Sequence, residues 1–314
     1  MPDLAVVIVS WNVRDLLAIC LHSLFADLDL SGLKAEVWVV DNASTDGSPE
    51  MVLREFSDVH LIASRENLGF VRGNNLALRQ ISNCSTERSR QSLQSPISKY
   101  IWLLNPDTEV QPGATAALLS TLQADSQAGM AGPKLLYPNG SLQHSAFRFP
   151  GLVQLIFDLF PLPTCFYDTP LNGRYPRRLY EGKEPFLVDH PLGASMMIKS
   201  VVVPDVGPMD EGFWMYCEEI DWCWRMHKAS WHIYCVPTAR VIHHAGQSSG
   251  QVPVSSFVNL WTSRARLYAR HHGPLTRRLA QVLVRVGMRQ RSRGASPEMI
   301  AACRQVIQAW EKVR

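Results

Sequence analysis

Four short stretches of this 314-residue sequence carry residue types that could bind a metal ion or take up a proton. Asp41 and Asp107 each follow a run of apolar residues, in VWVVD and YIWLLNPD. Residues 218–221 read Glu-Glu-Ile-Asp, and His243 and His244 follow the stretch ARVI. Carboxylates bind hard divalent cations, and carboxylates or imidazoles act as general bases. These residue types therefore suit a metal-assisted reaction or an acid–base reaction.

The apolar runs that precede these residues predict the elements that position them. Short, β-branched runs cover 5–11, 36–42, 59–64 and 100–107, and the first three are each followed by apolar residues at helical spacing. Alternation of strands and helices predicts an α/β fold with a mostly parallel sheet and helices on both faces. Ligands bind beyond the carboxyl ends of the strands in such sheets. We therefore expect the strand-end aspartates at the ligand-binding edge.

The rest of the chain is less regular. Residues 82–98 are rich in Ser, Gln and Arg and predict a surface insertion, to which we assign no chemistry. Residues 130–190 are rich in Pro and aromatic residues and predict loops around a mixed extension of the sheet. A strand is expected within 193–200, a helix within 217–230, and one or two strands within 231–246. Asn12 is a candidate cap for the first helix.

Composition excludes several classes of protein. The chain is 46% hydrophobic and 19% charged, which is typical of a globular protein. No apolar run approaches the roughly 18–20 residues that span a bilayer, and the N-terminus shows no basic segment followed by a cleavage site. The seven cysteines are scattered without a CxxC pair, which predicts reduced thiols in the cytoplasm. The sequence has neither GxGxxG after its first strand nor a P-loop.

Charge is distributed unevenly along the chain. Residues 264–314 hold 12 Lys or Arg and two acidic residues, a net charge of +10, so the remainder carries −7. Apolar residues recur at helical spacing within this tail, flanked by Arg277, Arg278, Arg285 and Arg289; the apolar positions are Leu275, Leu279, Val282, Leu283 and Val286. This pattern is typical of a helix at an anionic membrane surface, and equally of a helix packed on the protein with a solvated basic rim.

Taken together, the motifs resemble those of a known family. The stretches VIVSWN, VVDNASTDGS, RENLGFVRGNN, YIWLLNPDT, GASMMIKS, MYCEEIDWCWR and ARVIHHAG occur in the order expected of family 2 glycosyltransferases. More narrowly, the chain resembles the rhamnosyltransferase-like branch, over roughly residues 4–250. The resemblance implies a GT-A fold and an inverting transfer of a sugar, possibly rhamnose, from a nucleoside-diphosphate donor, assisted by a divalent metal such as Mg²⁺ or Mn²⁺.

The resemblance also implies roles for residues of the donor site. The family carries an Asp-x-Asp motif at the end of the fourth strand, where this chain has Asn105-Pro106-Asp107. Asp107 is therefore the expected metal ligand, and Asn105 is expected to hydrogen-bond the ribose or phosphate of the donor. His243 matches a family histidine that returns to the metal or the diphosphate. Asp41 matches the residue that binds the pyrimidine base, and the nucleotide pocket is expected to include Asn67, Gly69 and Asn74.

An inverting displacement needs a base that takes the proton of the acceptor hydroxyl. By family position Glu219 carries this role, although the usual residue is Asp, so Asp221 remains a rival. Adjacent acids raise one another's pKa where they are partly desolvated, which suits a base. A catalytically impaired protein of the same fold stays an alternative because Asn105 and Glu219 depart from the family pattern.

We predict a nucleotide-sugar-binding half over 1–110, an acceptor and catalytic half of the same domain over 111–250, and a basic amphipathic helical tail over 251–314. The expected partners are a nucleoside-diphosphate sugar and a glycan or lipid-linked acceptor in cell-surface polysaccharide synthesis. Cytoplasmic location with peripheral contact to the inner, anionic face of the cell membrane is expected. A nucleic-acid-binding protein is the rival class, but only the basic tail suggests it.

Overall fold

The computed structural model describes residues 3–88, 98–247 and 249–313, with the side chains of 82–88 and Ser249 left out. The helices are α1 (Arg14–Ser31), α2 (Ser48–Glu55), α3 (Gly69–Arg88), α4 (Ala114–Ala124), α5 (Leu152–Leu159), α6 (Arg177–Glu181), α7 (Val202–Val206), α8 (Glu218–Lys228), α9 (Pro253–His271), α10 (Pro274–Arg291) and α11 (Pro297–Glu311), with single 3₁₀ turns at Thr164–Phe166, Pro170–Asn172 and Ser249–Gln251. The strands are β1 (Leu4–Ser10), β2 (Ala35–Asp41), β3 (Val59–Ala63), β4 (Tyr100–Leu104), β5 (Thr108–Val110), β6 (Ala128–Leu136), β7 (Leu142–Gln143), β8 (Ala146–Phe147), β9 (Phe186–Leu187), β10 (His190–Pro191), β11 (Ser195–Lys199) and β12 (His232–His243).

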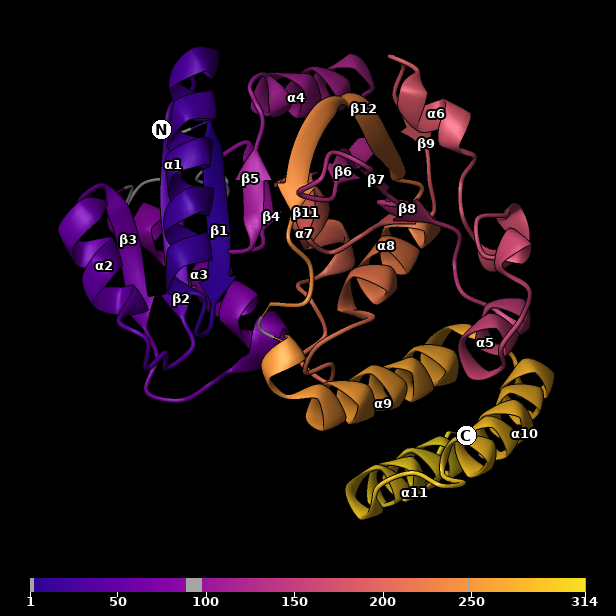
Figure 1. Cartoon of the computed structure of the whole chain (residues 1–314). Helices are drawn as coiled ribbons and strands as arrows, with labels where there is room; N and C mark the ends of the chain where they lie inside the picture. The colour runs from indigo at the N-terminus through magenta and orange to yellow at the C-terminus, as the bar shows by residue number, and fades with distance from the viewer. Residues whose placement is uncertain (1–2, 89–97, 248, 314) are drawn as a thin grey trace.

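One sheet organises the described part of the chain (Figure 1). Its main path runs β3-β2-β1-β4-β11-β6-β12-β5; off this path, β7 pairs with β6 and β9 pairs with β12. The first four strands are parallel, as the sequence predicts, while β11 runs antiparallel to both of its neighbours. The carboxyl ends of β1, β2 and β4 therefore lie at one edge of the sheet, and Asp41 is the last residue of β2.

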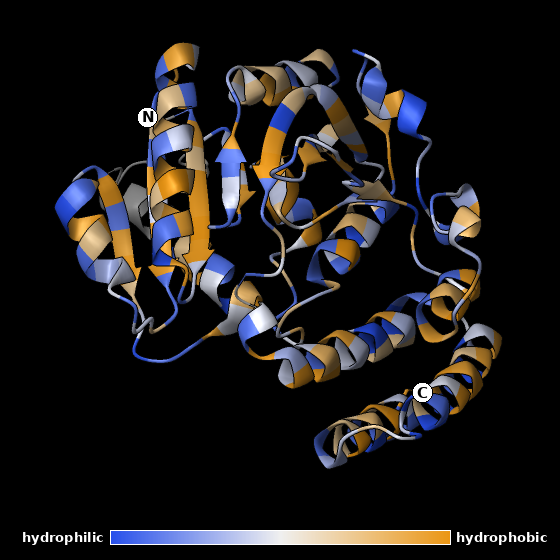
Figure 2. Cartoon of the chain, in the orientation of Figure 1, coloured by the Kyte–Doolittle hydropathy of each residue, from blue (hydrophilic) through white to orange (hydrophobic). Residues whose placement is uncertain are grey.

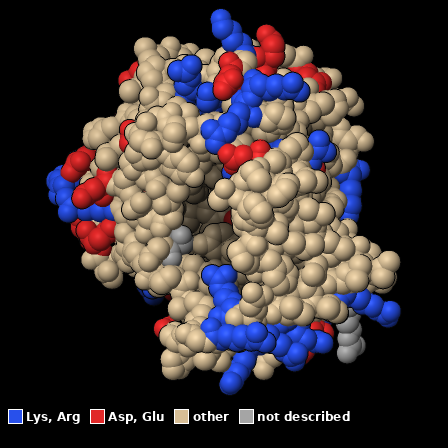
Figure 3. All heavy atoms as spheres, turned by 45° about the vertical axis from the view of Figure 1, so that its right-hand side comes forward, with Lys and Arg blue, Asp and Glu red and all other residues tan. Residues whose placement is uncertain are grey.

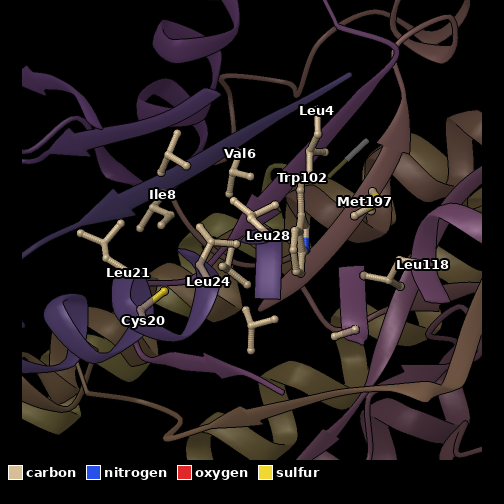
Figure 4. Close-up of a cluster of buried hydrophobic side chains, with 14 of the residues drawn as sticks. Leu4, Val6, Ile8, Cys20, Leu21, Leu24, Leu28, Trp102, Leu118 and Met197 are labelled. Carbon is tan, nitrogen blue, oxygen red and sulfur yellow. The ribbon is translucent and has the colours of Figure 1, made fainter. Parts of the chain in front are cut away.

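Helices cover both faces of the sheet because its central strands are apolar on both sides. Every residue of β1 is buried. Leu4, Val6 and Ile8 point toward the side chains of α1 on one face (Figure 4). Ala5 and Val7 belong to a second core on the opposite face, which includes Trp222 of α8. Because the two cores fix the positions of the strand ends, the side chains at those ends are held in place before a ligand binds.

The C-terminal helices form a third packing unit against the body. Trp261 of α9, Val284 of α10 and Trp310 of α11 share one buried cluster with Leu155 of α5. Helix α9 is also tied to the body, because the hydroxyl of Ser263 donates to the carbonyl of Met215 at 2.8 Å. The predicted tail is therefore helical and continuous with the fold. In the described residues no helix is both long and apolar enough to cross a membrane.

Two local expectations need adjustment. Asn12 does not cap α1, whose N-cap is Val13 without a side-chain bond; its amide oxygen accepts from the backbone N–H of Thr45 at 2.8 Å instead. Residues 82–88 of the predicted surface insertion continue α3 as helix, and residues 89–97 lie outside the described part of the chain. The six cysteines that the structure describes are free thiols.

Candidate active site

A cavity of about 240 Å³ lies at the carboxyl edge of the parallel strands. Its walls come from β1, the turn after β2, the start of α3, the segment after β4, and the start of α8. Of the predicted site residues, those that line it are Asn67, Gly69, Asn105, Asp107, Glu219 and His243. Figure 3 shows the molecule hollowed near the middle of the face that is turned to the viewer.

Asp107 and His243 meet in this cavity because two distant segments pair there. Strand β5 follows Asp107 and pairs antiparallel with the end of β12, which sets His243 opposite Thr108. The His243 Nε2 atom lies 3.4 Å from Asp107 Oδ1, and both side chains are nearly buried. Nδ1 of His243 is 2.9 Å from Oε1 of Gln143, to which it can donate a hydrogen bond. In that tautomer Nε2, on the side of Asp107, is the nitrogen that would ligate a metal.

This pair has the chemistry of a partial metal site. Mg²⁺ commonly takes one or two protein ligands and completes its coordination with water and substrate phosphates. Within the described residues no group of three or more His, Cys, Asp or Glu side chains comes together to hold a metal. The Gln143 amide orients the histidine as an outer partner orients a metal ligand. The residues present therefore fit a divalent cation that is shared with a bound diphosphate.

A second pair of the same chemistry lies beside the first but outside the cavity lining. His244 Nε2 is 2.6 Å from Oε1 of Glu109, and both side chains are partly exposed. His244 also donates its backbone N–H to the carbonyl of Asp107 at 2.9 Å. Of the two adjacent histidines, His243 is thus the one that the fold directs into the cavity, as the sequence predicts.

The turn after β2 forms the wall where a nucleoside is expected. Asp41 is 2% exposed and accepts from the backbone N–H of Ser44 through Oδ2 at 2.9 Å. Its Oδ1 atom is buried and has no hydrogen-bond partner in the described residues. Asn42, beside it, lines the cavity and donates its amide to the carbonyl of Gly69 at 3.2 Å. Asp41 thus lies just behind the lining, with one unsatisfied acceptor.

The start of α3 closes this wall. Asn67 accepts from the backbone N–H of Gly69 at 2.9 Å, which holds the turn. Gly69 has φ +74°, and a Cβ there would lie 2.8 Å from the carbonyl oxygen of Trp214, so only glycine fits. Asn74 is 1% exposed, donates to the carbonyl of Phe70, and does not line the cavity. The structure therefore brings Asn67 and Gly69 to the site and places Asn74 inside the helix.

The acidic cluster enters the cavity through a strained turn. Tyr216 and Cys217 have φ values of 71° and 65°, in the left-handed region that non-glycine residues rarely adopt. Helix α8 begins directly after them, and the side chains of Glu218 and Glu219 line the cavity. The Oε2 atom of each is buried without a hydrogen-bond partner in the described residues. This turn is a feature of the candidate site that the spacing of residues in the sequence did not predict.

Burial shifts the proton affinity of both glutamates. It raises the pKa of Glu219 to about 7, against the lowering effect of backbone N–H groups at the start of α8. The pKa of Glu218 is raised well above its usual value, first by burial and then by the neighbouring charge of Glu219. Glu218 therefore holds its proton more tightly than an exposed glutamate does, and Glu219, with a pKa of about 7, titrates around neutral pH. A carboxyl with a pKa near the working pH is suited to act as a base.

Asp221 of α8 is fully buried. Its oxygens lie 2.9 Å from Arg225 Nε, 2.9 Å from Arg270 Nε and 2.8 Å from His271 Nε2. Burial would raise its pKa, but the His271 hydrogen bond and the two guanidinium charges lower it to about 2. Asp221 does not line the cavity; it joins α8 to α9 and holds the helix that presents Glu219.

We expect Asp221→Asn to lower the free energy of unfolding by about 3 kcal/mol, because it takes the carboxylate from the largely buried Arg225, while Arg270 keeps Asp210. Because folding lowers the pKa of Asp221, its carboxylate stabilises the fold fully above pH 3.8, the ordinary pKa of an aspartate. This stabilisation is lost as pH falls through about 2. Denaturant titration at pH 7 measures the loss. Turnover per folded molecule should stay within about threefold, and a selective loss of turnover would instead make Asp221 the base.

A second cavity, of about 230 Å³, lies behind the first. It is lined by residues of α5, α8 and α9, including Leu155, Asp158, Arg264 and Tyr268. Tyr216, Leu192 and Glu219 line both cavities. The Glu219 side chain therefore stands between two spaces, one at the strand ends and one formed with the C-terminal helices. The contribution of α9 was not predictable from spacing, because it depends on how the tail packs.

The arrangement of these elements is the GT-A fold. Two solved structures share the fold: GalNAc-T7 with UDP, GalNAc and Mn²⁺, at TM-score 0.60 and 16% identity, covers 85% of this chain, which spans 48% of that protein. The mannosyltransferase of Pyrobaculum calidifontis with GDP-Man and Mn²⁺, at TM-score 0.57 and 14% identity, covers 99% of this chain and 85% of its own.

Residues 5–145 match the family described as glycosyl transferase family 2. The N-acetylglucosaminyl-diphospho-decaprenol L-rhamnosyltransferase of Mycobacterium tuberculosis is 29% identical over 219 residues, 70% of this chain and 69% of that protein. A low-salt glycan biosynthesis hexosyltransferase of Haloferax volcanii is 27% identical over 246 residues, 78% of this chain and 68% of its own. Over these residues the chain is similar to glycosyltransferase family 2 and to its rhamnosyltransferase-like members. The predicted family and fold are confirmed, and the nucleic-acid-binding alternative is not favoured.

Proposed function

We propose that the chain is an inverting, metal-assisted hexosyltransferase. It moves a sugar from a nucleoside-diphosphate donor to a glycan or lipid-linked acceptor in cell-surface polysaccharide synthesis. The observation that carries this proposal is the position of Glu219, which lines the cavity of the Asp107–His243 pair and the second cavity as well. Rhamnose is the expected sugar because the named mycobacterial relative is a rhamnosyltransferase. The cytoplasm, at the inner face of the cell membrane, is the expected location.

The donor would occupy the larger cavity. The unpartnered Oδ1 of Asp41 and the side chains of Asn42 and Asn67 lie where a nucleoside base would find hydrogen-bond partners. Asn105 lies on the path toward the diphosphate. Asp107 and His243 would hold a divalent metal, Mg²⁺ or Mn²⁺, which when bound offsets the negative charge of the leaving diphosphate. Glu218, whose raised pKa favours the protonated form, would donate a hydrogen bond to an oxygen of the bound sugar nucleotide.

The acceptor would approach Glu219 through the second cavity. In the reaction, the acceptor hydroxyl oxygen forms a bond to the anomeric carbon while the bond from that carbon to the diphosphate oxygen breaks. The electron pair leaves with the diphosphate, and the hydroxyl proton passes to the carboxylate of Glu219. A single displacement by this route inverts the anomeric configuration. Tyr216 and Leu192 also line both cavities.

A panel of nucleoside-diphosphate sugars, each with and without Mn²⁺, tests the proposal by thermal shift. We expect one donor to raise the melting temperature only when the metal is present. That donor, incubated with N-acetylglucosaminyl-diphospho-decaprenol, the acceptor named for the mycobacterial relative, should yield a product whose anomeric configuration, read by NMR, is inverted. Retention of configuration would exclude the single displacement, and binding without turnover would favour an impaired protein of the same fold.

A further inference from the structure

Helix α10 presents a row of aliphatic side chains to solvent. Leu275, Leu279, Val282 and Val286 are 72%, 47%, 54% and 51% exposed. At 100° per residue these four positions lie within an arc of about 60°. They constitute the outer row of α10. In Figure 2 the hydrophobic residues of this helix are visible at the periphery of the molecule. A continuous exposed aliphatic row of this kind marks an interaction surface.

The opposite side of α10 is what holds the helix to the protein. Ala280, Val284 and Met288 are fully buried. Gly287 lies against α5 so closely that a Cβ there would be 2.6 Å from Leu159 Cδ2. The outer row is therefore separate from the side chains that pack α10 against the core. It is a second apolar face, in addition to the one that packing requires.

Basic side chains border the outer row on one side. Arg278, Arg285 and Arg289 lie about 40–100° from its centre on the helical wheel. Arg278 and Arg289 are exposed, while Arg285 lies 3.1 Å from Glu311. Arg277 is on the inner side, where it donates to the carbonyl of Ala269, so it is not part of this border. In Figure 3, Lys and Arg side chains gather along the lower edge of the molecule, the height at which Figure 1 shows the C-terminal helices.

We infer that α10 lies on an anionic phospholipid bilayer, with the outer row in the interface and Arg278 and Arg289 against the lipid phosphates. An aliphatic row bordered by arginines is the pattern of an interfacial helix. A second copy of the chain fits less well, because a two-fold contact through the row would bring both basic borders together. Nucleic acid fits less well because its interfaces are polar, which leaves the aliphatic row without a partner.

A bilayer against α10 would lie close to the cavity that the acceptor is proposed to enter. This part of the inference rests on the proposed function. Helix α5 packs against α10 on one side and lines the second cavity with Leu155 and Asp158 on another. It also exposes Val153 and Ile156 to solvent. A bilayer under α10 would therefore lie one helix away from the cavity where the acceptor meets Glu219. A lipid-linked acceptor could enter that cavity without leaving the membrane surface.

Co-sedimentation of the full chain with vesicles, without donor or acceptor, tests the inference. We expect binding to phosphatidylglycerol-containing vesicles, at least about tenfold weaker binding to pure phosphatidylcholine, and a loss of binding as salt rises. Leu279→Gln with Val286→Gln, and separately Arg278→Gln with Arg289→Gln, should each weaken anionic-vesicle binding about tenfold or more. Leu30→Gln with Leu53→Gln, exposed leucines on α1 and α2, is the matched control and should bind as the parent.

Melting temperatures should be unchanged in all variants, since the substituted side chains are exposed. Transfer to a soluble acceptor analogue should also be unchanged, while transfer to the lipid-linked acceptor in vesicles should fall. Equal binding to neutral and anionic vesicles, or unaltered binding of both α10 variants, would overturn the inference. A dimer that dissociates only in the row variant would assign the row to a second copy. Vesicle binding without any transfer would instead contradict the proposed function alone.

Discussion

Glu219→Gln is expected to lower turnover by about 10²–10⁴-fold, the range typical for the loss of a general base. The amide keeps the shape of the side chain in both cavities but cannot take the acceptor proton. Because burial raises the pKa of Glu219 to about 7, turnover of the parent should rise with pH up to about 7 and then level off. Steady-state rates between pH 5 and 9 measure both effects, and donor binding should stay within about threefold.

The same substitution should make the protein more stable at alkaline pH. A carboxyl whose folded pKa is raised binds more protons folded than unfolded, so the free energy of unfolding falls as pH rises from 4.5 to about 7. Glu219→Gln removes this penalty and should raise the free energy of unfolding at pH 8 by about 1–3 kcal/mol. At pH 4.5 the gain should be much smaller. Denaturant titrations at the two pH values measure the difference.

Two variants separate these expectations from general damage. Glu219→Asp keeps a carboxyl, the usual family residue, and should retain at least about tenfold more turnover than the amide variant. Asp221→Asn should lose stability but not turnover per folded molecule. If Asp221→Asn abolishes turnover while Glu219→Gln does not, the roles of the two residues must be exchanged.

Asp107→Asn is expected to abolish the metal-dependent part of donor binding. Asp107 contributes the carboxylate of the proposed metal pair, and a neutral amide is a much weaker ligand for a hard divalent cation. Donor affinity, measured by calorimetry with and without Mn²⁺, should become the same in both conditions. Direct Mn²⁺ binding in the presence of nucleoside diphosphate gives a readout that does not depend on turnover.

Glu109→Gln is the matched control, because Glu109 lies two residues further on and also pairs with a histidine, His244, outside the cavity lining. It should leave metal-dependent donor binding unchanged. Unchanged binding in Asp107→Asn, or equal losses in both variants, would contradict the assignment of the metal to the Asp107–His243 pair.

Much of the fold could be predicted because its signals are local. The runs at 5–11, 36–42, 59–64 and 100–107 are apolar on both sides of each strand, and only a sheet covered on both faces buries them. The second half gave weaker signals, since β11 and the short edge strands are defined by pairing with distant segments. The direction of β11, antiparallel to β4, follows from that pairing and not from its own residues.

The candidate site was predictable in part. Asp107, His243 and Glu219 were expected from the resemblance to the family, and all three line one cavity. Asn74 and Asp221 carry the same kinds of polar group. However, Asn74 hydrogen-bonds within its own helix, and Asp221 is held in an ion-pair network. Gln143 carried no signal, because an isolated glutamine gains its role only from the histidine that it contacts.

By itself the sequence determined which residues end the strands. Where a buried apolar run is followed by Asp or Asn, these polar residues mark the point where the strand reaches the edge of the sheet. It also determined the net charge and aliphatic spacing of 275–286. The tertiary structure alone decided which carboxyl suits the proposed role of base: Glu219 lines two cavities, whereas Asp221, two residues later, meets Arg225, Arg270 and His271. Proton affinity depends on desolvation and on nearby charges, and both are set by segments far away in the chain.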